Sequence, residues 1–182
     1  MGPRVRGDNT IFCGGPGMTS HLRPGVIAGL AALALDQASK LWLLFVFDIA
    51  HRGAVKVTPF FDLVLAWNVG ISFGWFQTDS QPAQIGLMII KAVAVIVQAI
   101  WMARSRTLIA TVALGLIIGG AVGNAIDRFA YGAVVDFALF HVQIGGNTFN
   151  WYVFNLADVA IVAGVAALLY ESFLGVPAAK AP

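Results

Sequence analysis

Four apolar stretches dominate this chain, and each is long enough to cross a lipid bilayer as a helix. They lie near residues 26–47, 82–102, 107–126 and 153–173. A bilayer core about 30 Å thick requires about 20 helical residues. Only 11% of the residues are charged and 59% are hydrophobic, whereas soluble domains carry about 25% charged residues. We therefore predict an all-α integral membrane protein with four transmembrane helices.

The composition also limits the domain organisation and the possible partners. Residues 1–17 are Gly-rich and polar, which predicts a disordered leader, or an upstream start codon with Met18 as the natural start. We expect one membrane domain over residues 18–174 and a tail over 175–182. A net charge of +2 is too small to indicate nucleic-acid binding, and the lone Cys13 excludes an internal disulfide.

The distribution of Lys and Arg predicts the orientation in the membrane. The short loop between the second and third stretches carries Arg104 and Arg106, which is typical of a cytoplasmic loop. With both termini on the same side, six Lys and Arg fall inside and three fall outside. We therefore expect cytoplasmic termini and two outer segments, 48–81 and 127–152. The β-branched and aromatic residues of the first outer segment predict short strands.

Polar residues that are unusual for a membrane protein converge on the predicted outer face. They are Asp36, Lys40, Asn68, Asn124, Asp127, Arg128, Asp136, Asn155 and Asp158. Asp36 and Lys40 are four residues apart, so they share a helix face and can form an ion pair, either structural or part of a site. Asn124, Asp127 and Arg128 fit either interfacial anchors or site support. Lys91 lacks a partner in its own helix and either extends to the interface or pairs with another span.

Small residues predict close packing of the third and fourth spans. Gly115, Gly119 and Gly123 recur every four residues in the third span, and Ala157, Ala160, Gly164 and Ala167 form a similar stripe in the fourth. Such faces let helices approach closely in lipid. This packing would bring Asp136 and Asp158 toward each other.

Two readings are open for Asp136 and Asp158. Carboxylates near helix N-termini can serve as caps, but a fourth helix that begins near Val153 would place Asp158 too deep for that role. Intramembrane carboxylates usually have functional roles. Two of them in a poorly solvated place would share one proton, so that one activates water while the other donates to a carbonyl. A metal site is less favoured, because no His or Cys is nearby.

Five motifs carry a resemblance to a known family. They are "DQASK" (36–40), "NVGISFG" (68–74), "GGAVGNAIDR" (119–128), "VVDF" (134–137) and "FNLAD" (154–158). In this order, from about Arg23 to Tyr170, the chain resembles the lipoprotein signal peptidases, also called signal peptidase II. The resemblance implies a four-span aspartic endopeptidase of the bacterial inner membrane, with a small outer-face β platform and a short surface helix. It implies cleavage of diacylglyceryl-modified prolipoproteins just before the lipidated cysteine, without a cofactor, and inhibition by globomycin.

The resemblance also implies roles for individual residues. Asp136 and Asp158 would be the catalytic pair. Residues that shape the site and hold the substrate would be Asp36, Asn68, Gly70, Asn124, Asp127, Arg128 and Asn155. We add Lys40 to this supporting set because of its spacing from Asp36, not because of the resemblance. The rival hypothesis is a proton- or cation-coupled transporter that uses the same carboxylates. A transporter would place them near the bilayer midplane, often in repeated halves, whereas here they lie toward one face and no repeat is visible.

Overall fold

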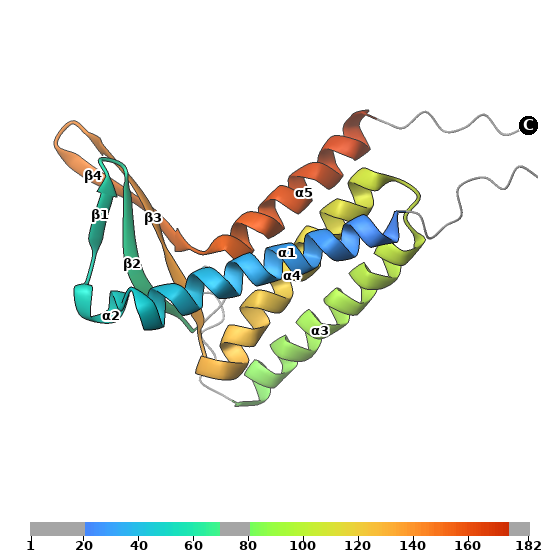
Figure 1. Cartoon of the computed structure of the whole chain (residues 1–182), viewed down its shortest axis with the longest axis horizontal. Coiled ribbons are helices and arrows are strands. Elements are labelled where there is room, and N and C mark those ends of the chain that lie inside the picture. The colour runs from blue at the N-terminus through green and yellow to red at the C-terminus, as the bar shows by residue number, and fades with distance from the viewer. Residues whose placement is uncertain (1–20, 70–80, 175–182) are drawn as a thin grey trace, which may run out of the picture.

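The protein consists of a helical bundle with a small antiparallel sheet at one end (Figure 1). The computed structural model describes residues 21–69 and 81–174. Within these residues the bundle contains α1 (Leu22–Leu41), α3 (Gln81–Arg104), α4 (Leu108–Tyr131) and α5 (Leu156–Leu174). A π-helical turn, η1 (Trp42–Val46), and the short helix α2 (Ile49–Arg52) lead from α1 to the sheet. The sheet contains β1 (Val55–Thr58), β2 (Phe61–Asn68), β3 (Val134–Ile144) and β4 (Asn147–Phe154).

Three helical segments of the described chain are long and apolar enough to cross a membrane. They are Leu22–Val46, Leu108–Tyr131 and Leu156–Phe173, and they overlap the predicted first, third and fourth spans. The predicted second span, 82–102, lies within α3, a helix of 24 residues. At about 1.5 Å per residue a helix of this length can reach across a bilayer core. That α3 crosses the membrane stays a prediction.

The ends of α4 follow from its local sequence. Thr107 precedes the helix and its Oγ1 accepts a hydrogen bond from Ala110 N at 3.2 Å, which satisfies one of the free N–H groups of the first turn. Gly132 follows the helix with φ +73° and donates its N–H to Arg128 O at 3.0 Å. The helix thus ends at Tyr131 rather than near residue 126, so Asp127 lies inside its last turns.

Glycines bring α4 close to two neighbouring helices, α1 and α5. A Cβ at Gly115 would collide with Gly25 O, and a Cβ at Gly119 would collide with Gly29 O. Gly115 and Gly119 therefore pack against α1, while the predicted close packing of the third and fourth spans is confirmed through other small residues. The contact with α5 uses Gly120, where a Cβ would lie 2.5 Å from Ala157 O. Close approach on two sides places α4 between α1 and α5, and small residues permit it in lipid.

The sheet has the simple order β1-β2-β3-β4, with all neighbours antiparallel. Strands β1 and β2 confirm the strands that we predicted in segment 48–81, where the short helix α2 also lies. Segment 127–152 contains all of β3 and most of β4, and we predicted no strands there. Their hairpin turn contains Gly145 and Gly146 with φ +60° and +83°, backbone angles that glycine adopts without strain.

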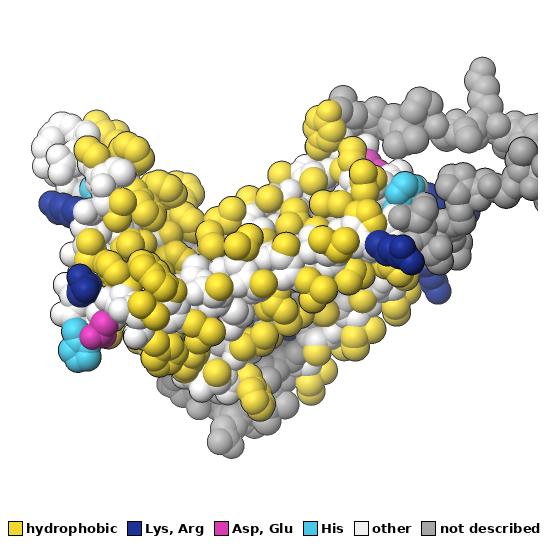
Figure 2. Space-filling view, in the orientation of Figure 1, with side chains coloured by type: hydrophobic (Ala, Val, Ile, Leu, Met, Phe, Trp, Pro, Cys, Tyr) yellow, Lys and Arg dark blue, Asp and Glu magenta, His cyan; other side chains and the backbone are white. Residues whose placement is uncertain are grey.

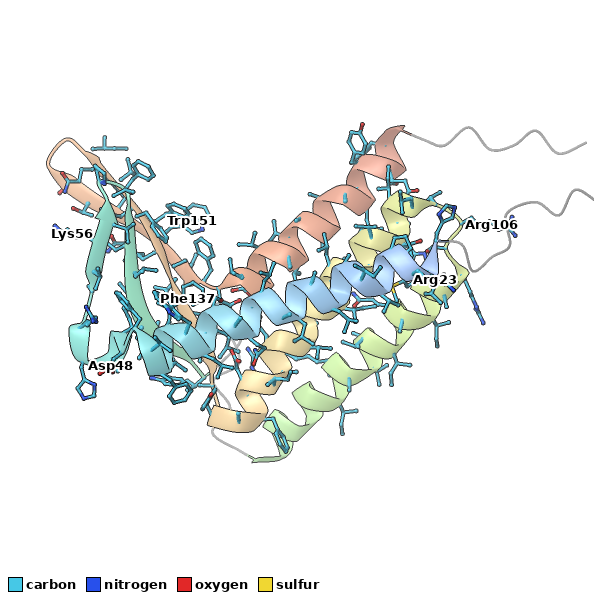
Figure 3. All side chains as sticks on the ribbon, in the orientation of Figure 1. Arg23, Asp48, Lys56, Arg106, Phe137 and Trp151 are labelled. Atoms are coloured by element: carbon cyan, nitrogen blue, oxygen red, sulfur yellow. The ribbon has the colours of Figure 1, made fainter. Side chains whose placement is uncertain are left out.

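A small apolar core joins the sheet to the end of α1. Leu43 of η1 and Ile49 of α2 pack with Phe137 and Ala138 of β3, and all four are buried. Phe137 marks this junction in Figure 3. Residues 134–138 are all buried, so the first half of β3, including Asp136, is held firmly between the helices and the rest of the sheet.

The fourth helix begins later than predicted. Val153 and Phe154 are the last residues of β4, and α5 begins at Leu156. The apolar run from Val153 onward therefore spans a strand end and a helix start. This shift changes the interpretation of Asp158, because it moves the carboxylate into the first turn of the helix.

Candidate functional site

Asn155 and Asp158 form a reciprocal cap at the start of α5. Asp158 N donates to Asn155 Oδ1 at 3.0 Å, and Asn155 N donates to Asp158 Oδ2 at 3.3 Å. This is the pattern of a capping box, in which the residue before the helix and the third residue of the helix satisfy each other's N–H groups. The prediction that Asp158 lies too deep to be a cap was wrong. Capping fixes the side chain of Asp158 at the N-terminus of α5.

Asn155 also connects the two candidate carboxylates. Its Nδ2 donates to Asp136 Oδ1 at 2.6 Å and to Asn124 Oδ1 at 3.0 Å. Asn124 Nδ2 in turn donates to Asp158 Oδ1 at 2.9 Å. The carboxylates of β3 and α5 therefore both contact the fully buried residue Asn155, the first through its side chain and the second through its backbone N–H. Two amides hold the two acids in one hydrogen-bonded group.

Asp136 receives a second amide from the sheet. Asn68, the last residue of β2, donates Nδ2 to Asp136 Oδ2 at 3.1 Å. The register explains the contact, because Asn68 pairs with Val134 and Ala66 pairs with Asp136 on the neighbouring strand. Both oxygens of Asp136 thus accept a hydrogen bond from a neutral donor.

Burial raises the pKa of Asp136 above its ordinary value. Its exposed fraction is only 3%, so removal from water penalises the charged form. The amide of Asn68 acts in the opposite direction, while the charge of Asp158 raises the pKa further. Asn155 and Lys40 lower it to a smaller extent. The balance favours a carboxyl that keeps its proton to a higher pH than a solvent-exposed aspartate.

A buried ionic group lies next to the acids and is connected to them through Asn124. Lys40 Nζ is 2.8 Å from Asp36 Oδ2 and 2.7 Å from Asp127 Oδ2, and it donates to Asn124 Oδ1 at 3.1 Å. All three charged residues are almost completely buried, with exposed fractions of 0–1%. The predicted pair of Asp36 and Lys40 is present, and Asp127 is its third member. Through Asn124 this group contacts the amides that hold the two acids.

The two carboxylates of the ionic group also hold the backbone segments that carry the acids. Ala157 N donates to Asp36 Oδ1 at 2.9 Å, next to Asp158 in the chain. Val135 N donates to Asp127 Oδ2 at 3.1 Å, next to Asp136. Hydrogen bonds to charged groups are stronger than those between neutral groups. The ionic group therefore fixes the starts of α5 and β3 relative to one another.

Gln37 is a site residue that our sequence analysis missed. Its Nε2 donates to Asp127 Oδ1 at 3.0 Å, to Gly123 O at 3.1 Å and to Asp36 Oδ2 at 3.2 Å. A Gln beside the Asp36–Lys40 pair is not distinctive in sequence. The signal that was available is its position between Asp36 and Lys40, two residues that the sequence analysis had already selected.

The remaining predicted residues lie at the edge of the site or outside the described chain. Arg128 is half-buried, donates Nη1 to Asn124 O at 3.3 Å, and interacts electrostatically with Asp136, Asp158 and Asp127. Gly70 lies outside the described residues. The ion pairs of the described residues do not include Lys91, which is exposed on α3.

The arrangement fits acid–base chemistry better than metal binding. In the described part of the chain, His, Cys, Asp and Glu side chains form no group of three that could hold a metal ion. Asp36 and Asp127 are occupied by Lys40, which leaves Asp136 and Asp158 as the acids available to a ligand. Paired carboxyls of different environment can divide the roles of acid and base between them.

Comparison with known proteins gives consistent matches over most of the chain. The family model described as signal peptidase (SPase) II matches residues 28–174. Over 161 residues the chain is 75% identical to the lipoprotein signal peptidase of Nitrobacter hamburgensis and 66% identical to that of Rhodopseudomonas palustris. Each alignment covers 88% of this chain and 98% of the relative.

Two solved structures, each described as a bacterial membrane enzyme, share the fold. One has a TM-score of 0.69 at 23% identity and covers 87% of this chain and 92% of the other. The second has a TM-score of 0.67 at 24% identity and covers 84% and 94%. Identity this low supports the similarity of fold and nothing finer.

Proposed function

The chain belongs to the signal peptidase II family and removes signal peptides from prolipoproteins, and we propose that Asp136 and Asp158 carry out this hydrolysis as an aspartic pair. The observation that supports the pair is that both carboxylates accept hydrogen bonds from one buried residue, Asn155: Asp136 accepts from its side-chain amide and Asp158 from its backbone N–H. Acids that contact a common group in a poorly solvated place cannot both ionise without cost. The resting pair then holds one shared proton.

The proposed reaction uses both protonation states. The ionised carboxylate removes a proton from a water molecule as that water attacks the carbonyl carbon of the scissile peptide bond. The protonated carboxyl donates its proton to the carbonyl oxygen, so the tetrahedral intermediate forms without a free oxyanion. When the intermediate collapses, the carboxyl that took the proton from water gives it to the leaving amine, and the carbon–nitrogen bond breaks. The other carboxyl recovers its proton from the intermediate's hydroxyl.

The surrounding residues position the pair. Asn68 and Asn155 bind Asp136, and Asn124 binds Asp158, so neither acid can rotate freely. Proton transfer and nucleophilic attack depend strongly on alignment, and small misplacements reduce rates substantially. Lys40, Asp36 and Asp127 are positioning residues, because they contact the amides and backbone segments rather than the reacting atoms. Arg128 supplies positive charge near both acids.

The proposed substrate is a diacylglyceryl-modified prolipoprotein, cut just before the lipidated cysteine. A lipid anchor keeps the scissile bond near the bilayer surface, and the pair lies where the ends of α1, α4 and α5 meet the sheet. Our proposal is that this end faces away from the cytoplasm in the bacterial inner membrane, with both termini cytoplasmic. The six-to-three distribution of Lys and Arg supports this orientation.

A cleavage assay tests this function directly. Purified full-length protein is incubated with a lipidated prolipoprotein in detergent, and the released signal peptide is quantified with and without globomycin. We expect cleavage that depends on lipidation of the substrate and is blocked by globomycin. Cleavage of the unlipidated substrate at the same rate would contradict the proposed substrate class, and activity that requires an added metal ion would contradict the mechanism.

A further inference from the structure

The two edges of the sheet are built differently. The strand order makes β1 and β4 the edge strands, whose outer N–H and C=O groups have no strand partner in the described part of the chain. Natural proteins protect such edges with short strands, Lys, Pro or irregular pairing. Strand β1 is four residues long, carries Lys56, and pairs irregularly between Lys56 and Thr58. This edge is therefore protected against the addition of another strand.

Strand β4 lacks most of this protection. Its eight residues, Asn147–Phe154, include no charged residue and no Pro, and residues 147–152 are all exposed. Among the described residues, β4 pairs with β3 alone. The pairing shifts once, between Leu139 and His141, and leaves consecutive regular pairs from Asn147 to Asn150. An open edge of this kind is the surface to which extended peptides add in β-augmentation.

Strand β4 also leads directly into the proposed catalytic site. It ends at Phe154, and the next residue, Asn155, donates to Asp136 and caps the helix that carries Asp158. From this point the edge extends back to the hairpin turn. A peptide whose scissile bond lies at the two acids therefore lies at the end of the β4 edge.

The part of the substrate that follows the cut is the part that fits this edge. Under the proposed function, an apolar signal peptide precedes the cut and the lipoprotein itself follows it. Figure 2 shows hydrophobic side chains over the helices and charged side chains at the two ends of the molecule, and α1, α4 and α5 include the segments that can cross a membrane. The signal peptide suits the bilayer beside these helices. The lipoprotein then leaves the acids on the side of the sheet (Figure 1).

The direction of the chains determines how they would pair. Strand β4 runs toward the acids from Asn147 to Phe154, whereas a substrate chain that follows the cut runs away from them. Pairing along this edge would therefore be antiparallel, as it is between the neighbouring strands of the sheet. At about 3.3 Å per residue, about eight extended substrate residues match the length of β4.

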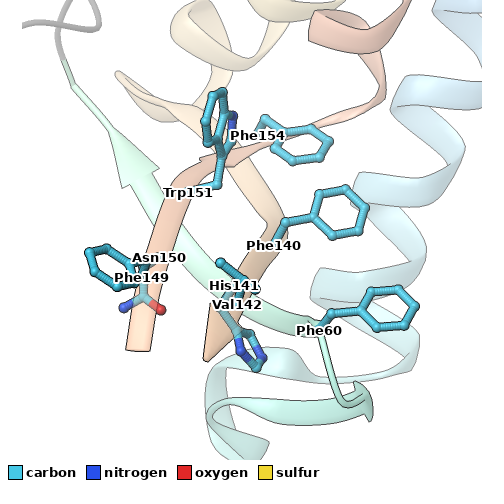
Figure 4. A pocket seen from close by; sticks show the side chains of 8 residues that line it. All are labelled: Phe60, Phe140, His141, Val142, Phe149, Asn150, Trp151 and Phe154. Carbon is cyan, nitrogen blue, oxygen red and sulfur yellow. The ribbon is translucent and has the colours of Figure 1, made fainter. Parts of the chain in front are cut away.

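A cavity of about 480 Å³ lies against the same edge (Figure 4). Half of its lining belongs to β4, and aromatic rings form most of its wall. The lining residues are Phe60, Phe140, His141, Val142, Phe149, Asn150, Trp151 and Phe154. A cavity beside an open edge can hold a side chain of an added strand.

His141 provides this cavity with an unused hydrogen-bond acceptor. Its side chain is 10% exposed, and its Nε2 lies 3.3 Å from Asp62 Oδ2 on β2. Its Nδ1 is buried and has no hydrogen-bond partner among the described residues, although buried polar groups are nearly always hydrogen-bonded. A proton on Nε2, next to the carboxylate, leaves Nδ1 as an acceptor. A ligand side chain with an N–H or O–H would satisfy it.

We propose that the first residues of the lipoprotein after the cut add to β4 as an extended antiparallel strand, with one side chain in the cavity. This binding presupposes the proposed function and concerns the part of the substrate that the sheet holds. Main-chain hydrogen bonds to the edge do not depend on the substrate's sequence, whereas the cavity selects one side chain. The side chain that fits has an apolar body and a hydrogen-bond donor at its tip, as Tyr has.

Peptide substrates with single N-methylated amides test the pairing. Each carries the signal peptide, the lipidated cysteine and the following residues, and one amide among the first eight residues after the cut is methylated, which removes its N–H donor. In an antiparallel pair, alternate residues direct their N–H groups to the neighbouring strand. We therefore expect methylation at alternate positions to raise KM about fivefold with kcat unchanged, and methylation between them to have little effect.

Equal effects at all positions would overturn the proposal, as would an effect confined to the residue next to the cut. Failure to cleave the unmethylated peptide would instead contradict the proposed function, and a cross-link that needs no activity then decides the binding site. In full chains with Cys13→Ser, the variants Thr148→Cys on β4 and Val57→Cys on β1, both at exposed positions, are compared. Their disulfides with peptides that carry a free cysteine at the sixth to ninth residue after the cut are quantified.

We expect disulfides at residue 148 and few at residue 57. Equal amounts at the two positions would overturn the proposal. A disulfide between two copies of the chain at residue 148, unaffected by added peptide, would also overturn it, because a second copy would then occupy the edge.

Peptides with Tyr or Phe at one of the same positions test the cavity, because the two side chains differ only in the hydroxyl. We expect one position at which Tyr gives a several-fold lower KM than Phe. His141→Ala should remove this difference, while Gln143→Ala, at an exposed position outside the cavity lining, should keep it. A preference for Tyr that survives His141→Ala, or its absence at every position, would overturn the role of the cavity.

Discussion

Replacing Lys40 with Met should destabilise the folded protein strongly. Lys40 Nζ lies within 2.8 Å of both Asp36 and Asp127, and none of the three residues is more than 1% exposed. Met preserves most of the side-chain volume but removes the only positive charge of this group among the described residues. Two buried carboxylates then face each other without a counter-charge. Breaking a buried ion pair in this way costs roughly 3–5 kcal/mol, and we expect a loss near the upper end of that range.

The assay is equilibrium unfolding in detergent micelles, with Lys56→Met as the control. Lys56 is exposed on β1, so its replacement should change stability by less than about 0.5 kcal/mol. The double variant Lys40→Met/Asp36→Asn leaves one buried charge in place of two and should recover part of the loss. A Lys40→Met variant as stable as the Lys56→Met control would show that Asp36 and Asp127 do not need the lysine charge in the folded protein.

Three further predictions concern pH, packing and orientation. Because the pKa of Asp136 is raised by burial, the folded protein holds this proton to a higher pH than the unfolded chain does, so stability should fall as pH rises through that pKa. Between about pH 4 and pH 8, the stability of Asp136→Asn should fall less than that of the unmodified protein. An equal fall in stability would count against the raised pKa of Asp136. Gly119→Ala should lower stability more than Gly86→Ala, because a Cβ meets Gly29 O at the first position and nothing within 4 Å at the second; equal losses would contradict the close packing. In a Cys13→Ser background, Ser105→Cys should resist an impermeant thiol reagent added to intact cells, and labelling from outside would overturn the proposed orientation.

Hydropathy was sufficient to locate the helices, because long apolar runs have few alternatives in a membrane protein. It could not fix where α5 begins. Val153 and Phe154 are as apolar as the helix that follows, and only the tertiary pairing of Phe154 with Ala138 assigns them to a strand. The capping role of Asp158 followed from that boundary, so the error in one led to the error in the other.

The hairpin of β3 and β4 was predictable but was not predicted. Gly145-Gly146 between two runs of β-branched and aromatic residues is a recognised hairpin signal. The contact between the Gly115 and Gly119 face and α1, unlike the hairpin, could not be predicted from the sequence. A small-residue face predicts close packing, but it does not identify which neighbouring helix packs there.

Polar residues of the site were easier to select than to connect. Asp36, Asn124 and Asn155 attract attention because polar side chains are costly within apolar segments. Their partners depend on three-dimensional contacts between residues up to 121 positions apart, as in the hydrogen bond from Ala157 N to Asp36. Gln37 was missed for this reason, since only the folded chain shows that its amide joins two buried carboxylates.

Single-turnover cleavage by purified variants tests whether Asp136 and Asp158 both act in the chemical step. Asp136→Asn and Asp158→Asn keep the shape of each side chain but remove its ability to exchange a proton. Asp48→Asn, at an exposed aspartate before α2, is the control. With equal amounts of folded protein and saturating lipidated prolipoprotein, we expect each of the first two variants to lose cleavage by at least about a thousandfold and the control to keep the normal rate. Cleavage by either Asp136→Asn or Asp158→Asn at close to the normal rate would contradict the assignment of the pair.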